Sequence, residues 1–306
     1  MELYFLGTGA GVPAKARNVS SIALKMPEYG GKLWLFDSGE GTQQQILKSP
    51  LKLSKLEKLF VTHLHGDHIF GIPGLLGSRS FQGGSSPLTI YGPRGIRRFI
   101  NTALKSSQTN LPYKLDIVEF TNGVIVDDKD FTVEIAQLDH VIPSYGFRIT
   151  ERDQAGKLQI DRLQAAGIPP GPLYQKIKQG ERIQLSDGRT IDGRHYVGPP
   201  IRGRIVTILG DTRPCTAAVT LAQQADELVH EATYSEHDKL LAARHLHSTT
   251  VQAAQTAHKA NVTILILTHI SVRYNNDDRL LLQEARQVFA KTALAHDFFS
   301  YTIPRK

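Results

Sequence analysis

The stretch Thr62–His68 (THLHGDH) gathers three histidines and one aspartate directly after an apolar run. His63 and His65 are two residues apart, so in an extended turn both imidazoles can face one point, and Asp67 and His68 follow at once. Neutral imidazole and carboxylate oxygen are ligands that suit zinc, iron or manganese. A catalytic zinc takes about three protein ligands and keeps a position for water. Four candidate ligands in one turn therefore predict a site for two metal ions.

Further ligand-type residues stand where other apolar, β-branched runs end, and each precedes a turn. Side chains at strand ends point out of the edge of a sheet, where the active sites of layered α/β proteins gather. We therefore predict one cluster of metal ligands made of His63, His65, Asp67, His68, His140, Asp211 and His269. The histidines that match no ligand position are interpreted as surface or packing residues: His195, His237, His245, His258 and His296.

The elements that must position these residues follow from the pattern of apolar side chains. Short β-branched runs predict strands at residues 1–7, 20–26, 32–39, 56–63, 130–140, 144–150, 203–212, 226–233, 262–269 and 298–303. Helical spacing predicts helices at residues 40–49, 93–107, 247–260 and 277–294. Ser248 and Thr249 are placed to cap the third of these helices. Alternating strands and helices favour a layered α/β fold over an all-β barrel.

Composition sets outer limits on the function. The chain has 306 residues, of which 41% are hydrophobic, enough for one large domain or two modest ones. A single cysteine, Cys215, excludes a disulfide framework and a thiolate zinc cluster. No charged leader with an apolar stretch and no bilayer-spanning run is present, which predicts a soluble, cytoplasmic protein. The net charge of +7 is consistent with a polyanionic partner.

Residues 151–204, here called the inserted segment, interrupt the alternation of strands and helices. The segment is rich in glycine and proline and holds ten Lys and Arg against six Asp and Glu, so it contributes more than half of the net charge. Its dense turn residues argue against a helix-strand unit of the main fold. We interpret it either as a solvated surface insertion or as a protruding basic arm.

The motif THLHGDH resembles the HxHxDH signature of hydrolases with the metallo-β-lactamase fold, and the later His140, Asp211 and His269 match that family's remaining ligands in order. The resemblance covers essentially the whole chain. It implies a single domain over residues 1–306, built as a four-layered αββα sandwich and holding two Zn²⁺ ions, with Mn²⁺ or another divalent ion as the alternative. One ion would be bound by His63, His65 and His140, the other by Asp67, His68 and His269, and Asp211 would bridge both.

Three further motifs restrict the resemblance to one family among the hydrolases of this fold. PAKARN (Pro13–Asn18), HEAT (His230–Thr233) and HST (His247–Thr249) resemble the motifs of the ribonuclease Z family, the tRNA 3′-processing endonucleases, in the short form. The inserted segment resembles the flexible arm that grips tRNA in that family. Each motif also has a plain interpretation: an ordinary basic turn, a buried His–Glu pair and a helix N-cap.

The resemblance implies removal of the 3′ trailer from precursor tRNA by hydrolysis after the discriminator base, which leaves a 3′-hydroxyl on the tRNA. Asp67 would bind metal and accept a proton from the attacking water. We expect His247 to protonate the leaving oxygen, with Glu231 orienting or charging it. Lys15, Arg17 and the inserted segment would contact tRNA phosphates. The resemblance also implies a homodimer in which one subunit's arm holds the tRNA that the other subunit cuts.

Three alternatives belong to other classes of protein. A general phosphodiesterase or arylsulfatase-like hydrolase of the same fold would not need PAKARN or a basic arm. A non-catalytic RNA-binding module with structural zinc would have a closed and usually thiolate-rich site. A β-lactamase would be secreted, and no signal peptide is present.

Overall fold

The computed structural model describes residues 1–185, 187–275 and 277–305, which form two compact units. The first unit contains Met1–Ile149 and Ile205–Ile303. The second unit contains Thr150–Arg204 together with Pro304 and Arg305.

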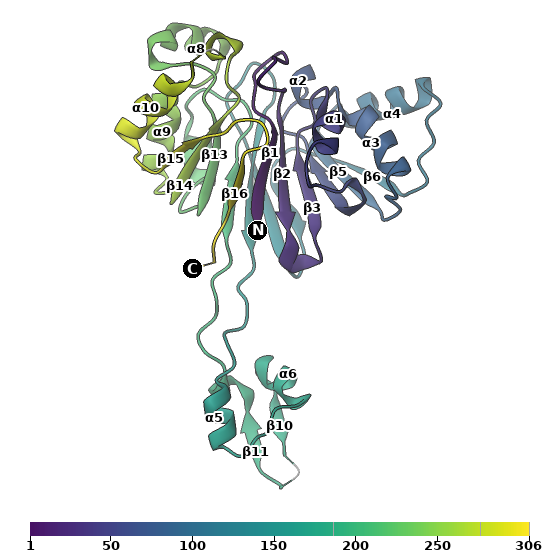
Figure 1. The fold of residues 1–306 in the computed structure, drawn as a ribbon, viewed down its shortest axis with the longest axis vertical. Helices are drawn as coiled ribbons and strands as arrows, with labels where there is room; N and C mark the ends of the chain where they lie inside the picture. The colour runs from purple at the N-terminus through teal and green to yellow at the C-terminus, as the bar shows by residue number, and fades with distance from the viewer. Residues whose placement is uncertain (186, 276, 306) are drawn as a thin grey trace. The chain divides into compact units, whose positions relative to one another are not determined.

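Two seven-stranded sheets pack face to face in the first unit (Figure 1). The strand order of the first sheet is β16-β1-β2-β3-β4-β5-β6, with β1 (Glu2–Gly7), β2 (Ser21–Met26), β3 (Lys32–Phe36), β4 (Leu56–Phe60), β5 (Leu88–Pro93), β6 (Leu115–Phe120) and β16 (Ser300–Thr302). The strand order of the second is β15-β14-β13-β12-β9-β8-β7, with β7 (Gly123–Asp127), β8 (Phe131–Gln137), β9 (Tyr145–Glu151), β12 (Ile205–Ile208), β13 (Glu227–Glu231), β14 (Ile264–Thr268) and β15 (Thr292–Leu294).

Helices cover the outer faces of both sheets (Figure 1). The first sheet is covered by α1 (Thr42–Leu47), α3 (Ile72–Phe81) and α4 (Ile96–Ser106), and the short α2 (Gly66–Ile69) follows β4. The second is covered by α7 (Thr216–Leu221), α9 (Thr250–Lys259) and α10 (Arg279–Val288), and α8 (Lys239–His245) precedes α9. Short 3-10 turns of the first unit are η1 (Pro27–Tyr29), η2 (Leu53–Lys55), η4 (Glu236–Asp238) and η5 (Val272–Tyr274). This is the predicted layered α/β fold. Within the described residues, no helix has the length and apolar character to span a bilayer.

An aromatic cluster fills the space between the two sheets. The ring of Phe60 lies 4.9 Å from that of Phe36, 5.5 Å from Trp34 and 5.4 Å from Phe147 across the interface. All four side chains are fully buried. Because helices cover the opposite faces, the central strands are apolar on both sides, as their near-continuous apolar runs predict.

Strand direction brings the ends of distant strands to one edge of the sandwich. Strands β3, β4 and β5 run parallel to one another in the first sheet, and β12 to β15 do so in the second. The carboxyl ends of parallel strands meet at the same edge of a sheet. The turns after β4, β12 and β14, which carry THLHGDH, Asp211 and His269, therefore lie at such edges.

All the predicted strands are present, and one predicted helix is corrected. The pattern over residues 277–294 predicts one helix, but α10 ends at Val288 and residues Thr292–Leu294 form strand β15 beside β14. The β-branched Thr292 gains a buried position and ladder hydrogen bonds at the edge of the sheet, which outweighs its helical spacing. The expected cap is confirmed for Thr249, which forms a capping box with Gln252 at the start of α9, whereas the Ser248 hydroxyl donates to the Thr212 carbonyl.

The inserted segment contains regular structure that its composition does not predict. It forms α5 (Ile160–Ala165), α6 (Leu173–Lys178), β10 (Arg182–Gln184), β11 (Thr190–Asp192) and the 3-10 turn η3 (Gly193–Tyr196). These elements share a small core of Leu163, Ile168, Ile177, Ile183 and Ile191. At the base of the unit, the buried carboxylate of Glu151 accepts hydrogen bonds from the guanidinium groups of Arg204 and Arg305.

The aromatic cluster generates a prediction about stability. Phe60→Ala should lower the free energy of unfolding by about 3–5 kcal/mol, because a fully buried ring is replaced by a cavity. Urea unfolding followed by the fluorescence of Trp34, the chain's single tryptophan, measures this. The matched control is Phe81→Ala, since Phe81 is 94% exposed and should change stability by less than about 0.5 kcal/mol. Equal effects of the two substitutions would contradict this account of the core.

Candidate metal and catalytic site

The structure brings all seven predicted metal ligands together. His63, His65, His140 and Asp211 each offer a ligand atom, and these atoms lie within 4.8 Å of one another. Asp67, His68 and His269 form a second such group. The carboxylate of Asp211 lies between the groups, with Oδ2 3.6 Å from His63 Nε2 and 3.3 Å from His269 Nε2. The arrangement offers two adjacent ligand sets with one shared carboxylate.

Asp37 orients two of the histidines. Its carboxylate accepts hydrogen bonds from the Thr62 amide at 2.7 Å and the Thr62 hydroxyl at 2.8 Å, and it lies 2.7 Å from His68 Nδ1. The Thr62 hydroxyl oxygen lies 2.9 Å from His63 Nδ1 and, having given its proton to Asp37, accepts one there. Both imidazoles therefore carry a proton on Nδ1 and turn Nε2 towards the cluster.

Thr233 of the HEAT motif and Leu246, which precedes the HST motif, orient two more imidazoles. The Thr233 hydroxyl donates to Glu231 Oε2 at 2.7 Å, so its oxygen accepts from His269 Nδ1 at 2.9 Å. The carbonyl of Leu246 accepts from His140 Nδ1 at 3.0 Å. These bonds turn the Nε2 atoms of His269 and His140 towards the cluster, and an unprotonated Nε2 is the atom through which imidazole binds a metal.

The converging imidazole nitrogens and carboxylate oxygens of the cluster fit a cation. The hydrogen bond to Thr62 leaves His63 Nε2 unprotonated, and this atom lies 3.0 Å from His65 Nδ1. His68 Nε2 is buried and has no hydrogen-bond partner among the described residues, yet it lies 3.5 Å from Asp67 Oδ2 and 3.6 Å from Asp211 Oδ1. Burial lowers the pKa of His68, but the charges of Asp211, Asp37 and Asp67 outweigh it and raise that pKa well above its ordinary value, so the cluster attracts positive charge. Imidazole nitrogen and carboxylate oxygen are suitable donors for a divalent ion.

The charges in the cluster shift its pKa values in opposite directions. Burial raises the pKa of Asp67, but the nearby charges of His68 and His269 and their hydrogen bonds outweigh it, so the pKa lies far below its usual range. Burial also raises the pKa of Asp211, and the surrounding imidazoles hold it well below its usual value. Burial, reinforced by the charge of His68, lowers the pKa of His63 well below its ordinary value. Ionised carboxylates and a neutral His63 are the protonation states that bind metal.

Unusual backbone conformations mark the same loops. Asp37, Leu246 and His269 have φ values of 57°, 56° and 57°, in the left-handed region that non-glycine residues rarely adopt. Such conformations cost on the order of 1–3 kcal/mol each and persist where the surrounding structure enforces them. Gly39 allows a close approach, since a Cβ atom there would lie 2.2 Å from the carbonyl oxygen of Asp67.

His247 and Glu231 form a pair beside the cluster. His247 Nδ1 donates to Glu231 Oε1 at 2.8 Å, and the same oxygen accepts from the Thr212 amide at 3.0 Å. Burial disfavours the charged imidazolium, but the charge of Glu231, its hydrogen bond and the charge of Asp211 outweigh that effect and raise the pKa of His247 to about 9. His247 is therefore positively charged at neutral pH and keeps Nε2 free to donate.

The PAKARN loop reaches the site through its backbone. The Gly11 amide, just before the motif, donates to Asp67 Oδ2 at 2.8 Å. Lys15 is exposed. Arg17 is only 4% exposed, and its guanidinium donates to Thr8 Oγ1, the carbonyl of Ala295 and Asp278 Oδ2. The predicted phosphate contact by Arg17 does not fit this arrangement, because its donors are used inside the protein to hold the loop.

Sequence reasoning missed the residues that orient the ligands. Asp37 follows strand β3 in the same way as His63 follows β4, so the strand-end rule applied to the first part of the chain could have found it. Thr62 and Thr233 carry no such signal, because a hydroxyl beside a histidine is common. Leu246 acts through its backbone carbonyl, which side-chain chemistry cannot predict.

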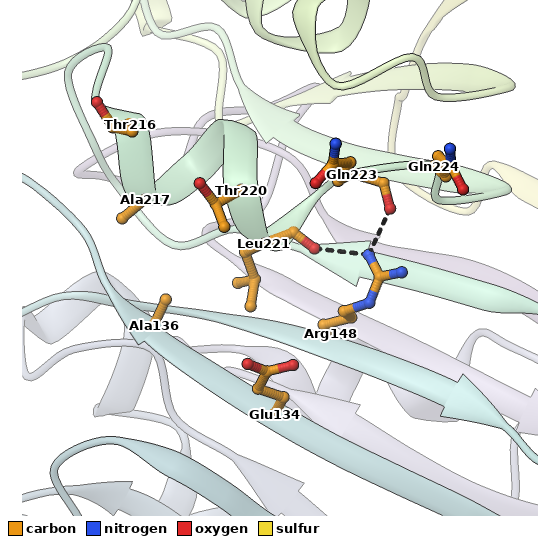
Figure 2. Close-up of a pocket in the computed structure, with 9 residues that line it drawn as sticks. All are labelled: Glu134, Ala136, Arg148, Thr216, Ala217, Thr220, Leu221, Gln223 and Gln224. Carbon is orange, nitrogen blue, oxygen red and sulfur yellow. Dashed lines mark hydrogen bonds between the residues drawn. The ribbon is translucent and has the colours of Figure 1, made fainter.

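A cavity of about 660 Å³ lies elsewhere in the first unit (Figure 2). It is bounded by strands β8 and β9 and helix α7, and Arg148 donates to the carbonyl oxygens of Leu221 and Gln223 at 2.8 Å each. Its described lining contains one carboxylate, Glu134, and no histidine. The chemistry therefore belongs to the sheet edge and not to this cavity.

Comparisons with known proteins agree with the fold and the motifs. Ribonuclease Z of Geobacillus kaustophilus (strain HTA426) is 58% identical over 306 residues, 100% of both chains. Ribonuclease Z of Latilactobacillus sakei subsp. sakei (strain 23K) is 56% identical over 99% of this chain and 98% of its own length. Residues 1–157 also match the family model described as Anti-Pycsar protein Apyc1, a region that contains His63 to His140 but neither Asp211 nor His269.

Solved structures agree as well. The short form of human tRNase Z is 32% identical with a TM-score of 0.73, covering 99% of this chain and 100% of its own. The metallo-β-lactamase fold protein YhfI from Bacillus subtilis is 18% identical with a TM-score of 0.69, covering 98% of each chain, and supports the fold alone. The fold and site together define a hydrolase of the metallo-β-lactamase fold. Within that class, the chain belongs to the ribonuclease Z family of endoribonucleases.

The two hydrogen bonds that the Thr233 hydroxyl makes with Glu231 and His269 generate a prediction about metal binding. Thr233→Val keeps the side-chain shape but removes both hydroxyl hydrogen bonds, so His269 loses its orienting acceptor. Zinc affinity, measured by competition with a chromophoric chelator, should fall about 10-fold to 100-fold. Thr233→Ser retains the hydroxyl and is the matched control, with affinity close to that of the wild type. A zinc affinity equal to that of the wild type in the valine variant would show that the Thr233 hydroxyl does not orient His269.

Proposed function

We propose that this protein removes the 3′ trailer from precursor tRNA by hydrolysing the phosphodiester bond after the discriminator base, which leaves a 3′-hydroxyl on the tRNA. One observation carries the proposal: two adjacent ligand sets lie beside the His247–Glu231 pair, so metal binding and proton donation converge at one place. The names of the similar proteins, Ribonuclease Z and tRNase Z, support the choice of substrate.

The cofactor in this proposal is a pair of Zn²⁺ ions, with Mn²⁺ as the alternative. One set of ligands is His63, His65 and His140, the other is Asp67, His68 and His269, and Asp211 is common to both. Bound there, two divalent ions would lower the pKa of a shared water and offset the negative charge that develops on the phosphate. The protein's part is to keep four imidazoles in one tautomer through Asp37, Thr62, Thr233 and Leu246.

Asp67 would accept the proton of the attacking water. Its carboxylate is ionised, and the Gly11 amide holds Oδ2 at 2.8 Å, so the group cannot rotate freely. A carboxylate held in one orientation among the metal ligands can accept a proton from a water bound there. The PAKARN loop thereby contributes to the chemistry through its backbone, whatever contacts Lys15 makes with RNA.

His247 would donate a proton to the departing ribose 3′-oxygen. Glu231 accepts from its Nδ1, which fixes the ring and stabilises the imidazolium, and Nε2 carries the proton to be transferred. Glu231 is itself held by Thr212 and Thr233. This is the arrangement of a general acid whose carboxylate partner orients it.

The inserted segment and Lys15 would bind the phosphates of the tRNA body. The segment carries four excess positive charges, and Lys157, Lys176 and Lys178 are exposed. Phosphate contacts position an RNA without reading its sequence, and shape is the main readout for folded RNA. In this proposal the chain is one hydrolase domain with an inserted RNA-binding arm, and it acts as a homodimer in which each arm serves the opposite active site.

The function is tested by incubating the zinc-loaded protein with a precursor tRNA that carries a 3′ trailer and mapping the cut. We expect one cut after the discriminator base, a free 3′-hydroxyl, and loss of cleavage after chelation that zinc or manganese restores. Two ions per chain are expected by elemental analysis. Cuts at many unrelated positions, or activity without divalent ions, would overturn the proposal.

The His247–Glu231 pair generates a prediction that separates acid catalysis from metal binding. His247→Ala should reduce cleavage of precursor tRNA by about 10²-fold to 10⁴-fold with unchanged metal content. His245→Ala is the control, because His245 is exposed two residues away and should have no effect. Because His247 also lies within ligand distance of Asp211 and His269, a parallel loss of metal would identify it as a ligand instead.

The inserted segment generates a prediction that separates binding from chemistry. Gln154 and Ile201 form an antiparallel bridge, so residues 155–200 can be replaced by a short Gly-Ser linker between adjacent ends. Metal content and hydrolysis of bis(4-nitrophenyl) phosphate should persist, whereas precursor tRNA should bind more weakly. The slope of log affinity against log salt should flatten by about 0.7–0.9 for each phosphate that the shortened chain no longer neutralises. The double variant Lys176→Gln/Lys178→Gln keeps the hydrophobic core of the inserted segment. It should weaken tRNA binding less than the deletion does.

Mixed dimers test the cross-subunit arrangement. A chain without residues 155–200 is mixed with a full-length chain carrying Asp67→Asn, so each heterodimer has one arm opposite one intact site. Partial recovery of tRNA cleavage is expected in verified heterodimers. Absence of recovery would reject the cross-subunit arrangement. The role of the inserted segment in tRNA binding would then rest on the result of the deletion variant alone.

A further inference from the structure

Phe70 is a large aromatic side chain that stays exposed beside the metal-binding turn. It follows His68 by two residues and is 62% exposed. Its ring lies directly over Gly66, where a Cβ atom would come within 2.2 Å of ring carbon Cε2. Gly66 separates His65 from Asp67, so the ring lies against the backbone of the ligand loop.

The ring is held in place although much of its surface is free. The Phe70 amide donates to the Gly66 carbonyl at 2.9 Å and closes the short helix α2. On one side the ring neighbours Phe99 of helix α4, at 6.4 Å between centroids and an angle of 32°. An exposed apolar ring that the backbone orients is better suited to contact a ligand than to fill the core.

Positive charge flanks the same turn. Gly95, at the start of α4, is so close to the ligand loop that a Cβ atom there would lie 3.0 Å from Cδ1 of Leu64. Arg94 and Arg98 on either side of Gly95 are exposed. The carboxylate of Glu119 already accepts the Gly95 amide at 2.7 Å, so an anion at this end would be bound by the arginine side chains and not by the helix terminus.

We propose that Phe70 is a stacking platform for a nucleobase of the single-stranded RNA next to the scissile phosphate, and that Arg94 and Arg98 contact neighbouring phosphates. The proposal rests on the proposed ribonuclease function and adds how the unpaired 3′ end is held. Unpaired bases stack on aromatic rings, and every base has a π face, so a ring beside the metals can hold the strand without reading its sequence. The combination of an oriented ring with nearby cations favours RNA over an apolar protein partner.

Three substitutions at Phe70 separate stacking from apolar packing. For precursor tRNA, kcat/KM should fall about 10-fold to 100-fold in Phe70→Ala, with a similar fall in Phe70→Leu, which keeps apolar bulk without a π face. Phe70→Trp should restore it to within about 3-fold of the wild type. The loss on precursor tRNA should exceed any loss on bis(4-nitrophenyl) phosphate by at least about 10-fold at equal metal content. Phe81→Ala, at an exposed ring at the end of α3, is the control and should change neither activity.

A spectroscopic readout identifies the stacked base. Precursor tRNA carrying 2-aminopurine on either side of the scissile phosphate is mixed with protein in a stopped-flow instrument. Quenching before the cut is expected with the wild type and with Phe70→Trp, and not with Phe70→Ala. Full rescue by leucine, unchanged quenching in the alanine variant, or a changed oligomeric state by light scattering would overturn the proposal, the last by assigning Phe70 to a protein interface. Failure of the wild type to cut precursor tRNA would instead overturn the proposed function.

Discussion

The carboxylate of Asp211 and the imidazoles around it are the interaction on which the rest of the structure depends. An ionised carboxylate costs several kcal/mol to bury unless it is paired. Asp211 is 3% exposed and lies within 3.6 Å of His63, His68 and His269, whose Nε2 atoms surround it. The imidazoles come from both sheets, so this local electrostatic requirement is met only when the whole sandwich is assembled.

Two buried carboxylates outside the ligand cluster, those of Asp37 and Glu231, orient the imidazoles within it. Asp37 follows a strand of the first sheet. It accepts a hydrogen bond from the Thr62 hydroxyl, which in turn accepts from His63 Nδ1, and it accepts directly from His68 Nδ1. Glu231, from the second sheet, uses Thr233 to set His269 and also holds His247. A hydroxyl that donates its one proton to a carboxylate can only accept a hydrogen bond from the imidazole beside it. The hydrogen bonds that link carboxylate, hydroxyl and imidazole therefore all run in one direction. The same network that orients the imidazoles therefore also stabilises the positive charge of His247.

In the proposed function, chemistry and recognition depend on different parts of the chain. The ligand cluster and the proton donor lie in the first unit, whereas the basic inserted segment has its own small core of leucine and isoleucine. A segment with its own core can vary its surface charge without disturbing the sheets that hold the ligands. The exposed ring of Phe70 differs from the segment because it lies against the backbone of the ligand turn at Gly66.

The sequence alone determined the ligand residues' types and spacing, the strands they follow, the layered fold and the family, because period-2 apolar runs and HxHxDH spacing are local properties. The tertiary structure alone decided what each polar group bonds to. Arg17 resembles a phosphate contact in sequence, yet it lies buried against Asp278, 261 residues away. The strand at Thr292–Leu294 likewise formed because β14 offered a free edge. Hydrogen-bond partners are set by positions in space, and no local pattern encodes which distant segments will meet.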